Sequence, residues 1–275
     1  MSQTSVALLG AIAGFTIFLG LPVARLRALS ASAQGFLNAI ATGVLLFLLV
    51  EILGHANESV EDTMAGIGRG DLAPFALLGG VYLVGLVGGL VGLVSFNRLF
   101  MRRARTQALR GPGAAVASPS RSVPAARDLA LMIATGLGLH NFSEGLAIGQ
   151  SAAANALALT GVLVVGFGLH NVTEGFGIAA PMAGDRKRPS WGFLALAGLI
   201  GGGPTFLGAV IGFNVVAQWA FVLFLTLAAG ALVYVINEMF GVCRRLNGTM
   251  ALAAGILVGF LLAFGTELFL TAAGA

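Results

Sequence analysis

Residues 73–96 read APFALLGGVYLVGLVGGLVGLVSF and contain no charged side chain. An α-helix needs about 20 mostly apolar residues to cross a bilayer, because it rises only ~1.5 Å per residue. The whole chain has the same character: 57% of its 275 residues are hydrophobic and 9% are charged. In an ordinary soluble domain roughly 25% of the residues are charged. The sequence therefore predicts an integral membrane protein.

Eight stretches of this kind follow one another along the chain. We predict an all-α fold: a polytopic membrane protein with eight transmembrane helices. The first stretch lacks a basic leading region and is too long for the apolar core of a signal peptide, so we interpret it as a span. The predicted spans are 5–23, 34–54, 73–96, 129–149, 157–181, 191–213, 217–241 and 249–272.

The basic residues indicate how the chain is oriented. All of the 15 Lys and Arg residues except Arg69 fall in the connections after the first, third, fifth and seventh predicted spans. Short cytoplasmic loops carry the excess of positive charge in membrane proteins, so both termini should be extracytoplasmic. This placement also accounts for the isoelectric point of about 10.2 without a nucleic-acid partner. A compact chain of this kind favours the plasma (inner) membrane of a bacterium.

The longest connection divides the predicted helices into two groups. Residues 102–128 are rich in Arg, Ala, Ser and Pro, a composition that cannot bury a core. We expect a flexible cytoplasmic loop there. It links transmembrane helices 1–3, in residues 1–101, to helices 4–8, in residues 129–275, within a single membrane domain.

The fourth and fifth predicted spans carry one motif twice. The sequence reads GLGLHNFSEGLAIG at 136–149 and GFGLHNVTEGFGIA at 166–179. In a helix, residues i and i+4 lie on one face, so the His and Glu of each motif project together, with the Asn at their edge. Ionisable residues near the middle of a span usually face the bundle interior and mark a substrate path. The duplication indicates two elements that face a shared site.

Two antiparallel helices with these faces together would offer imidazole, carboxylate and amide ligands to an ion. Imidazole with carboxylate suits Zn²⁺, Fe²⁺ and Co²⁺ better than Ca²⁺ or K⁺. The glycines around each motif and the hydroxyls of Ser143 and Thr173 favour bent, hydrated helices. The candidate metal ligands are His140, Asn141, Glu144, His170, Asn171 and Glu174.

The two motifs resemble those of the ZIP (Zrt-, Irt-like protein) family of divalent-metal transporters. HNFSEG at 140–145 is similar to the HNxPEG pattern of the family's span 4, and HNVTEG at 170–175 to the related pattern of span 5. YVINEMF at 234–240 also resembles the acidic segment of span 7. The resemblance implies that the six candidate residues bind the transported metal. It also implies a homodimer in which a transport bundle slides against a scaffold.

The chain departs from the family pattern at three places. Ser143 and Thr173 stand where the family motifs have proline, so the kinks should be softer. Asn171 stands where some members have an acid, and GGGPTFLGA at 201–209 lacks the glutamate that some members supply from span 6. The last two departures lower the negative charge at the site. We therefore expect one ion per transport cycle.

Further acids lie on other predicted spans. Glu51, His55 and Glu58 share one helical face at the outer end of the second span; a capture site is one interpretation, and an interfacial cluster without metal is the favoured one. For Glu238 an exit relay and a solvated helix end are both open. Glu267 is interpreted as structural.

These observations favour a transporter that takes divalent transition-metal ions into the cytoplasm. Zinc is the first choice of substrate, with iron, manganese, cobalt and cadmium also compatible, and no catalytic cofactor is implied. The alternative is an intramembrane metal-dependent hydrolase, in which a metal activates water. The HExxH arrangement places its glutamate beside the first histidine, where this chain has Asn141 and Asn171. We therefore do not expect an enzyme.

Overall fold

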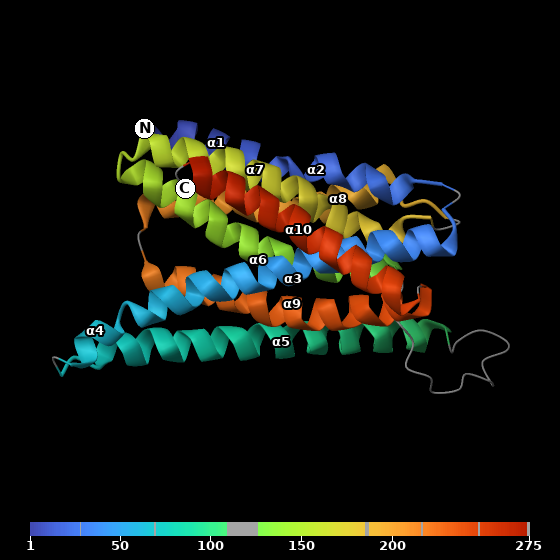
Figure 1. Cartoon of the computed structure of the whole chain (residues 1–275). Coiled ribbons are helices and arrows are strands. Elements are labelled where there is room, and N and C mark those ends of the chain that lie inside the picture. The colour runs from blue at the N-terminus through green and yellow to red at the C-terminus, as the bar shows by residue number, and fades with distance from the viewer. Residues whose placement is uncertain are drawn as a thin grey trace.

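The computed structural model of the chain describes residues 1–27, 29–68, 70–108, 126–184, 187–215, 217–246 and 248–273. Within these ranges the regular structure is entirely helical, which confirms the all-α prediction. The helices run roughly along one common direction (Figure 1). They are α1 (Gln3–Phe15), α2 (Ile17–Gly20), η1 (Leu21–Arg25), α3 (Ala31–Glu61), α4 (Met64–Ile67), α5 (Ala73–Ala108), α6 (Ala126–Ala153), α7 (Leu157–Ala179), η2 (Ala180–Met182), α8 (Trp191–Asn214), α9 (Gln218–Leu246) and α10 (Thr249–Ala273).

Seven helical stretches in the described residues are long and apolar enough to cross a membrane, as expected of an integral membrane protein. The predicted span that is not among these seven, 129–149, corresponds to α6, which is long enough at 28 residues but carries the polar HNFSEG motif. That motif lowers the mean hydropathy of α6. The count of eight spans and the placement of both termini outside stay predictions. The seven stretches are Gln3–Arg25, Ala31–Ile67, Ala73–Phe96, Leu157–Met182, Trp191–Asn214, Gln218–Leu246 and Thr249–Leu268.

The helices on either side of the predicted 102–128 loop are longer than expected. Helix α5 continues to Ala108 and α6 already begins at Ala126, so both helices extend into the stretch expected to form the loop. The reason is local: the stretch after residue 96 is rich in Arg, Leu, Met, Gln and Ala, which are good helix formers. The centre of the predicted loop, 109–125, lies outside the described residues.

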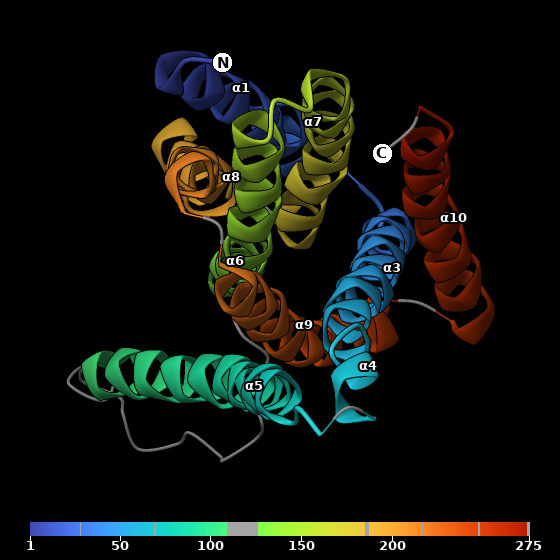
Figure 2. The ribbon, with the colours of Figure 1, turned by 90° about the vertical axis from the view of Figure 1, so that its left-hand side faces the viewer.

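Helix α6 lies in the middle of the helices, with α8, α7 and α9 around it (Figure 2). It packs most extensively against α8. Glycines allow this close approach: a Cβ at Gly208 of α8 would lie only 3.0 Å from the Cα of Gly145 and the backbone nitrogen of Leu146 on α6. Small residues let helix backbones meet in the same way in membrane bundles. The polar side chains of α6 can therefore face protein on most sides.

The first helix is interrupted at Thr16. Its hydroxyl donates to the Ala13 carbonyl at 2.7 Å, and the chain continues as α2 and then as η1, which contains Pro22. A second irregularity is Pro204 inside α8, which has no N–H for the carbonyl four residues earlier. Both places lie beside the polar centre described below, where backbone carbonyls accept side-chain hydrogen bonds.

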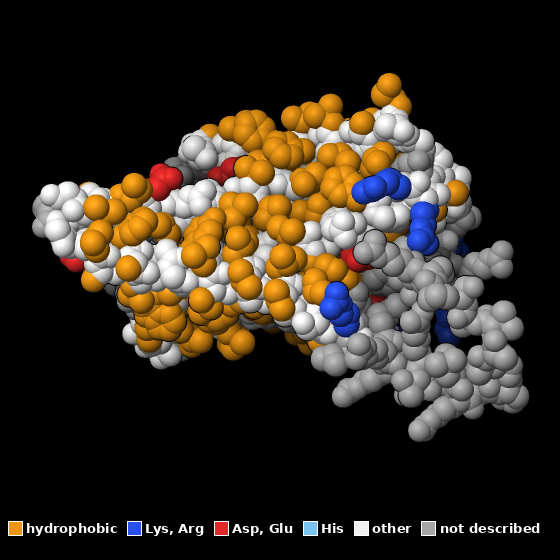
Figure 3. Space-filling view, turned by 90° about the horizontal axis from the view of Figure 1, so that it is seen from below, with side chains coloured by type: hydrophobic (Ala, Val, Ile, Leu, Met, Phe, Trp, Pro, Cys, Tyr) orange, Lys and Arg blue, Asp and Glu red, His pale blue; other side chains and the backbone are white. Residues whose placement is uncertain are grey.

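The surface matches a lipid environment along most of the bundle. Apolar side chains cover the face shown in Figure 3, and the Lys and Arg side chains visible there gather toward one end. Several large apolar side chains are more than half exposed, such as Leu83 at 63% and Val84 at 68%. The other end carries both termini and the short helix α4 (Figure 1).

Candidate metal site

Helices α6 and α7 bring the two motifs together inside the protein. His140, Asn141 and Glu144 lie on α6, and His170, Asn171 and Glu174 lie on α7. All six side chains are buried; Glu144, at 5% exposed, is the most accessible of them. Ionisable groups are rarely buried to this degree unless they are paired or bind a ligand.

Asn141 is the central hydrogen-bond donor of this arrangement. Its amide nitrogen donates to Asn171 Oδ1 at 2.6 Å, to Glu174 Oε2 at 2.7 Å and to the Gly201 carbonyl of α8 at 3.0 Å. One side chain of α6 is thus tied to α7 and α8. The Asn141 Oδ1 atom has no partner in the described structure, so this oxygen is the one left to face a cation.

Asn171 extends the same network to the first helix. Its amide nitrogen donates to the Ala13 carbonyl at 3.2 Å, just before the interruption at Thr16. Its oxygen already accepts from Asn141. In this arrangement Asn171 orients the neighbouring groups, and its oxygen is less available to an ion than that of Asn141.

The two histidines lie near each other without touching. Their ring centroids are 6.3 Å apart, and His140 Nε2 lies 3.4 Å from Glu144 Oε1. Neither ring nitrogen of either histidine has a hydrogen-bond partner in the described residues. The hydroxyls of Ser143 and Thr173 donate to the His140 and His170 carbonyls, at 2.6 and 2.7 Å, so they hold the backbone and not the rings.

Unpartnered polar atoms are concentrated at this place. Of the eleven buried side-chain N and O atoms without a hydrogen-bond partner in the described structure, eight belong to five of the six motif residues and to Glu51. Leaving such an atom buried and unsatisfied costs about 1–3 kcal/mol. Most of them bear lone pairs and none is a cationic donor, which is the chemistry of a cation site. The eight are Glu51 Oε2, His140 Nδ1 and Nε2, Asn141 Oδ1, Glu144 Oε2, His170 Nδ1 and Nε2, and Glu174 Oε1.

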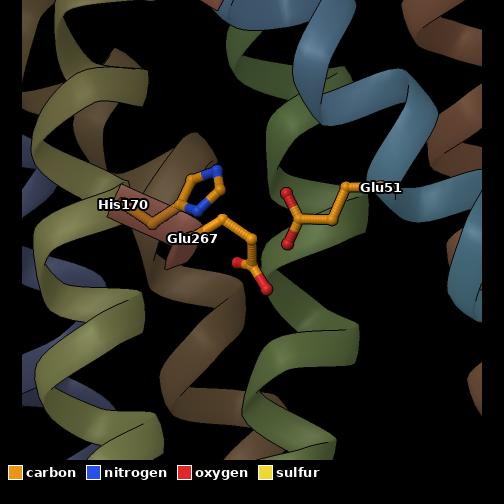
Figure 4. Close-up of side chains that lie close together, drawn as sticks. All are labelled: Glu51, His170 and Glu267. Atoms are coloured by element: carbon orange, nitrogen blue, oxygen red, sulfur yellow. The ribbon is translucent and has the colours of Figure 1, made fainter. Parts of the chain in front are cut away.

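The closest grouping of ligand atoms was not predicted. In the part of the chain that is described, one set of three His, Cys, Asp or Glu side chains brings its ligand atoms within 4.8 Å of one another: Glu51 of α3, His170 of α7 and Glu267 of α10. Their side chains point toward a common centre (Figure 4). Only His170 belongs to the predicted ligands. The four predicted His and Glu ligands do not form such a set among themselves.

Glu51 and Glu267 each carried a signal in the sequence. Both are acids inside predicted apolar spans, and such residues usually mark function. Glu267 was expected to be structural, whereas its carboxylate lies in the group of three. His55 and Glu58, which were expected to share a face with Glu51, are exposed, and neither joins the group of three. Glu238 of α9 is half-buried and also lies outside the group.

Together, the six motif residues with Glu51 and Glu267 form what we term the polar seam, contributed by α3, α6, α7 and α10. Four of its members are carboxylates, and no Lys or Arg ion pair with them is found among the described side chains. A seam of this composition can hold divalent cations.

No protein-family model matches the sequence, and no curated protein matches it.

Proposed function

We propose that this protein is a transporter that carries divalent transition-metal ions across a membrane through the polar seam. Zn²⁺ is the preferred substrate in this proposal, with Fe²⁺, Mn²⁺, Co²⁺ and Cd²⁺ as further candidates. The observation that carries it is the gathering of eight buried, unpartnered polar atoms along apolar helices. A structural membrane protein has no need for that arrangement.

The ligand chemistry supports a divalent transition metal over other cargo. Imidazole and carboxylate together bind Zn²⁺ and its neighbours in the first transition row. Glu144 and Glu174 bring two negative charges into a buried place, and one divalent ion would neutralise both. The network around Asn141 holds the backbones of α6, α7 and α8 in fixed relation, which would keep the ligands preorganised.

The direction of transport and the membrane in which the protein lies are part of the same proposal. The basic residues of the connections favour a cytoplasmic location for the end of the bundle away from the termini, so transport is proposed as uptake into the cytoplasm, in the plasma membrane of a bacterium. We further propose membership of the ZIP family, on the strength of the two motifs, and with it the homodimeric assembly that the resemblance implies.

The proposal is tested by uptake of radioactive Zn²⁺ into proteoliposomes. Wild type is compared with His140→Ala and Glu174→Ala, reconstituted in equal amounts. Glu58→Ala is the matched control, because Glu58 is an exposed acid on α3 outside the seam. We expect both seam variants to lose uptake and the control to retain it. Wild type that moves no metal, or seam variants that transport normally, would overturn the proposal; the first result calls for a hydrolase assay.

A further inference from the structure

Glu51, His170 and Glu267 come from three helices that are distant in sequence. Helices α3 and α10 pack against each other and both contact α7, and the three side chains converge from these helices (Figure 4). His170 is only 1% exposed, and both of its ring nitrogens lack a hydrogen-bond partner in the described residues. A buried imidazole aimed at two carboxylates is an unsatisfied group unless a ligand lies between them.

The composition of this group suits a divalent metal. Two carboxylate oxygens and one imidazole nitrogen within 4.8 Å of one another can contract onto an ion at ~2.0–2.2 Å. Three protein ligands leave a further coordination position for water, as in zinc sites that keep one position open. The two carboxylates also balance the charge of one divalent ion, which lowers the cost of placing it among apolar helices.

The charge of the whole seam gives an independent argument for a second ion. Glu144 and Glu174 each have one carboxylate oxygen in contact with a motif side chain, since Glu144 Oε1 lies against His140 and Glu174 Oε2 accepts from Asn141. Glu51 and Glu267 lie on other helices and are left without those contacts. Four carboxylates match the charge of two divalent ions.

We infer that Glu51, His170 and Glu267 form a second metal position, the outer position, beside the motif residues. It holds one divalent transition-metal ion while His140, Asn141, Glu144 and Glu174 hold another. A neutral imidazole has one lone pair for a metal, so His170 serves one position at a time and can pass an ion between them. This inference rests on the proposed function, to which it adds a loading step, and it differs from the one ion expected from the sequence.

The location of the outer position fits loading. Glu51 lies in the half of α3 that leads to α4, and Glu267 lies near the C-terminal end of α10. Both are therefore displaced toward the end of the bundle that carries the termini (Figure 1). In the proposed orientation this end faces outside, so the outer position is proposed to load an ion that enters from that side.

Metal stoichiometry of the purified full chain tests the inference. Bound Zn²⁺ is measured by equilibrium dialysis in detergent for wild type, for Glu51→Gln with Glu267→Gln, for His140→Ala with Glu144→Gln, and for the control Glu58→Gln. We expect two ions in wild type and in the control, and one ion in each double variant. One ion in wild type that persists in the Glu51 and Glu267 variant overturns the outer position and leaves the proposed function standing. Wild type that binds no ion overturns both.

A second variant keeps the test valid if the double variant does not fold. Glu267→Cys replaces one carboxylate by a thiolate, and Co²⁺ bound to a thiolate gives a charge-transfer band in the near ultraviolet. The band should appear in Glu267→Cys and be absent in Glu58→Cys, both of which retain the buried Cys243. A folded Glu267→Cys protein that binds Co²⁺ without the band shows that Glu267 is not a ligand.

Discussion

The contact between α6 and α8 gives a quantitative prediction, because Gly208 lies directly against the motif helix. A Cβ added at Gly208 would lie 3.0 Å from Gly145 Cα and from Leu146 N, and closer still to the Phe142 carbonyl oxygen. Ordinary contact begins at 3.4 Å. All three obstacles are backbone atoms, so no rotamer change relieves them. The Gly208→Ala variant must therefore push α6 and α8 apart, by roughly 1 Å at this point.

Overpacking of this kind costs about 1–3 kcal/mol, which corresponds to a melting temperature lower by about 4–8 °C for a cost near 2 kcal/mol. The same displacement stretches the 3.0 Å bond from Asn141 to the Gly201 carbonyl, so we also expect weaker Zn²⁺ binding. Thermal unfolding in detergent measures the first effect. Gly203→Ala on the same helix is the control, because its Cβ would meet nothing within 4 Å. Equal melting temperatures for the two variants would refute the reasoning.

Three further predictions concern the seam. Asn141→Leu removes the hydrogen-bond donor to Asn171, Glu174 and Gly201. It should lower the melting temperature of the metal-free protein by several degrees, since each buried group left unsatisfied costs about 1–3 kcal/mol. An unchanged melting temperature would show that the network does not hold the helices together. Zn²⁺ at about 100 times its Kd should stabilise wild type by about 2.7 kcal/mol, and a differential scanning measurement should find no such gain in the His140→Ala variant. Uptake in proteoliposomes should fall when the outer pH drops from about 7.5 to 5.5, because protons compete with metal for imidazole and carboxylate ligands; flat uptake over that range would exclude these ligands from control of the rate.

Much of the fold is readable from the sequence, because a bilayer demands long apolar segments and the chain supplies them in order. The predicted spans 157–181 and 191–213 differ from α7, η2 and α8 by a residue or so at each end. The helix ends differ from the expected loop bounds at Ala108 and Ala126, where helix propensity, and not hydropathy, decides the end of the helix. The order of the helices along the chain could be predicted from the sequence, whereas the helices that pack against one another in space could not.

The candidate site was predicted only in part for the same reason. Glu144 follows His140 by four residues, which predicts that the two side chains lie on one face of a helix. In the structure His140 Nε2 lies 3.4 Å from Glu144 Oε1. Nothing in the local spacing says that α3 and α10 lie against α7, so the convergence of Glu51 and Glu267 on His170 required the tertiary structure. The bond from Asn171 to the Ala13 carbonyl likewise depends on the docking of α1 on α7.

The central position of α6 has a consequence for biogenesis. Its main packing partners, α8, α9 and α7, are all synthesised after it, and its polar motif makes it the least favourable of the proposed spans to leave the translocon alone. In the proposed topology α6 should therefore wait beside the translocon until α7 emerges, so that the two enter the lipid as a hairpin with their polar faces turned toward each other.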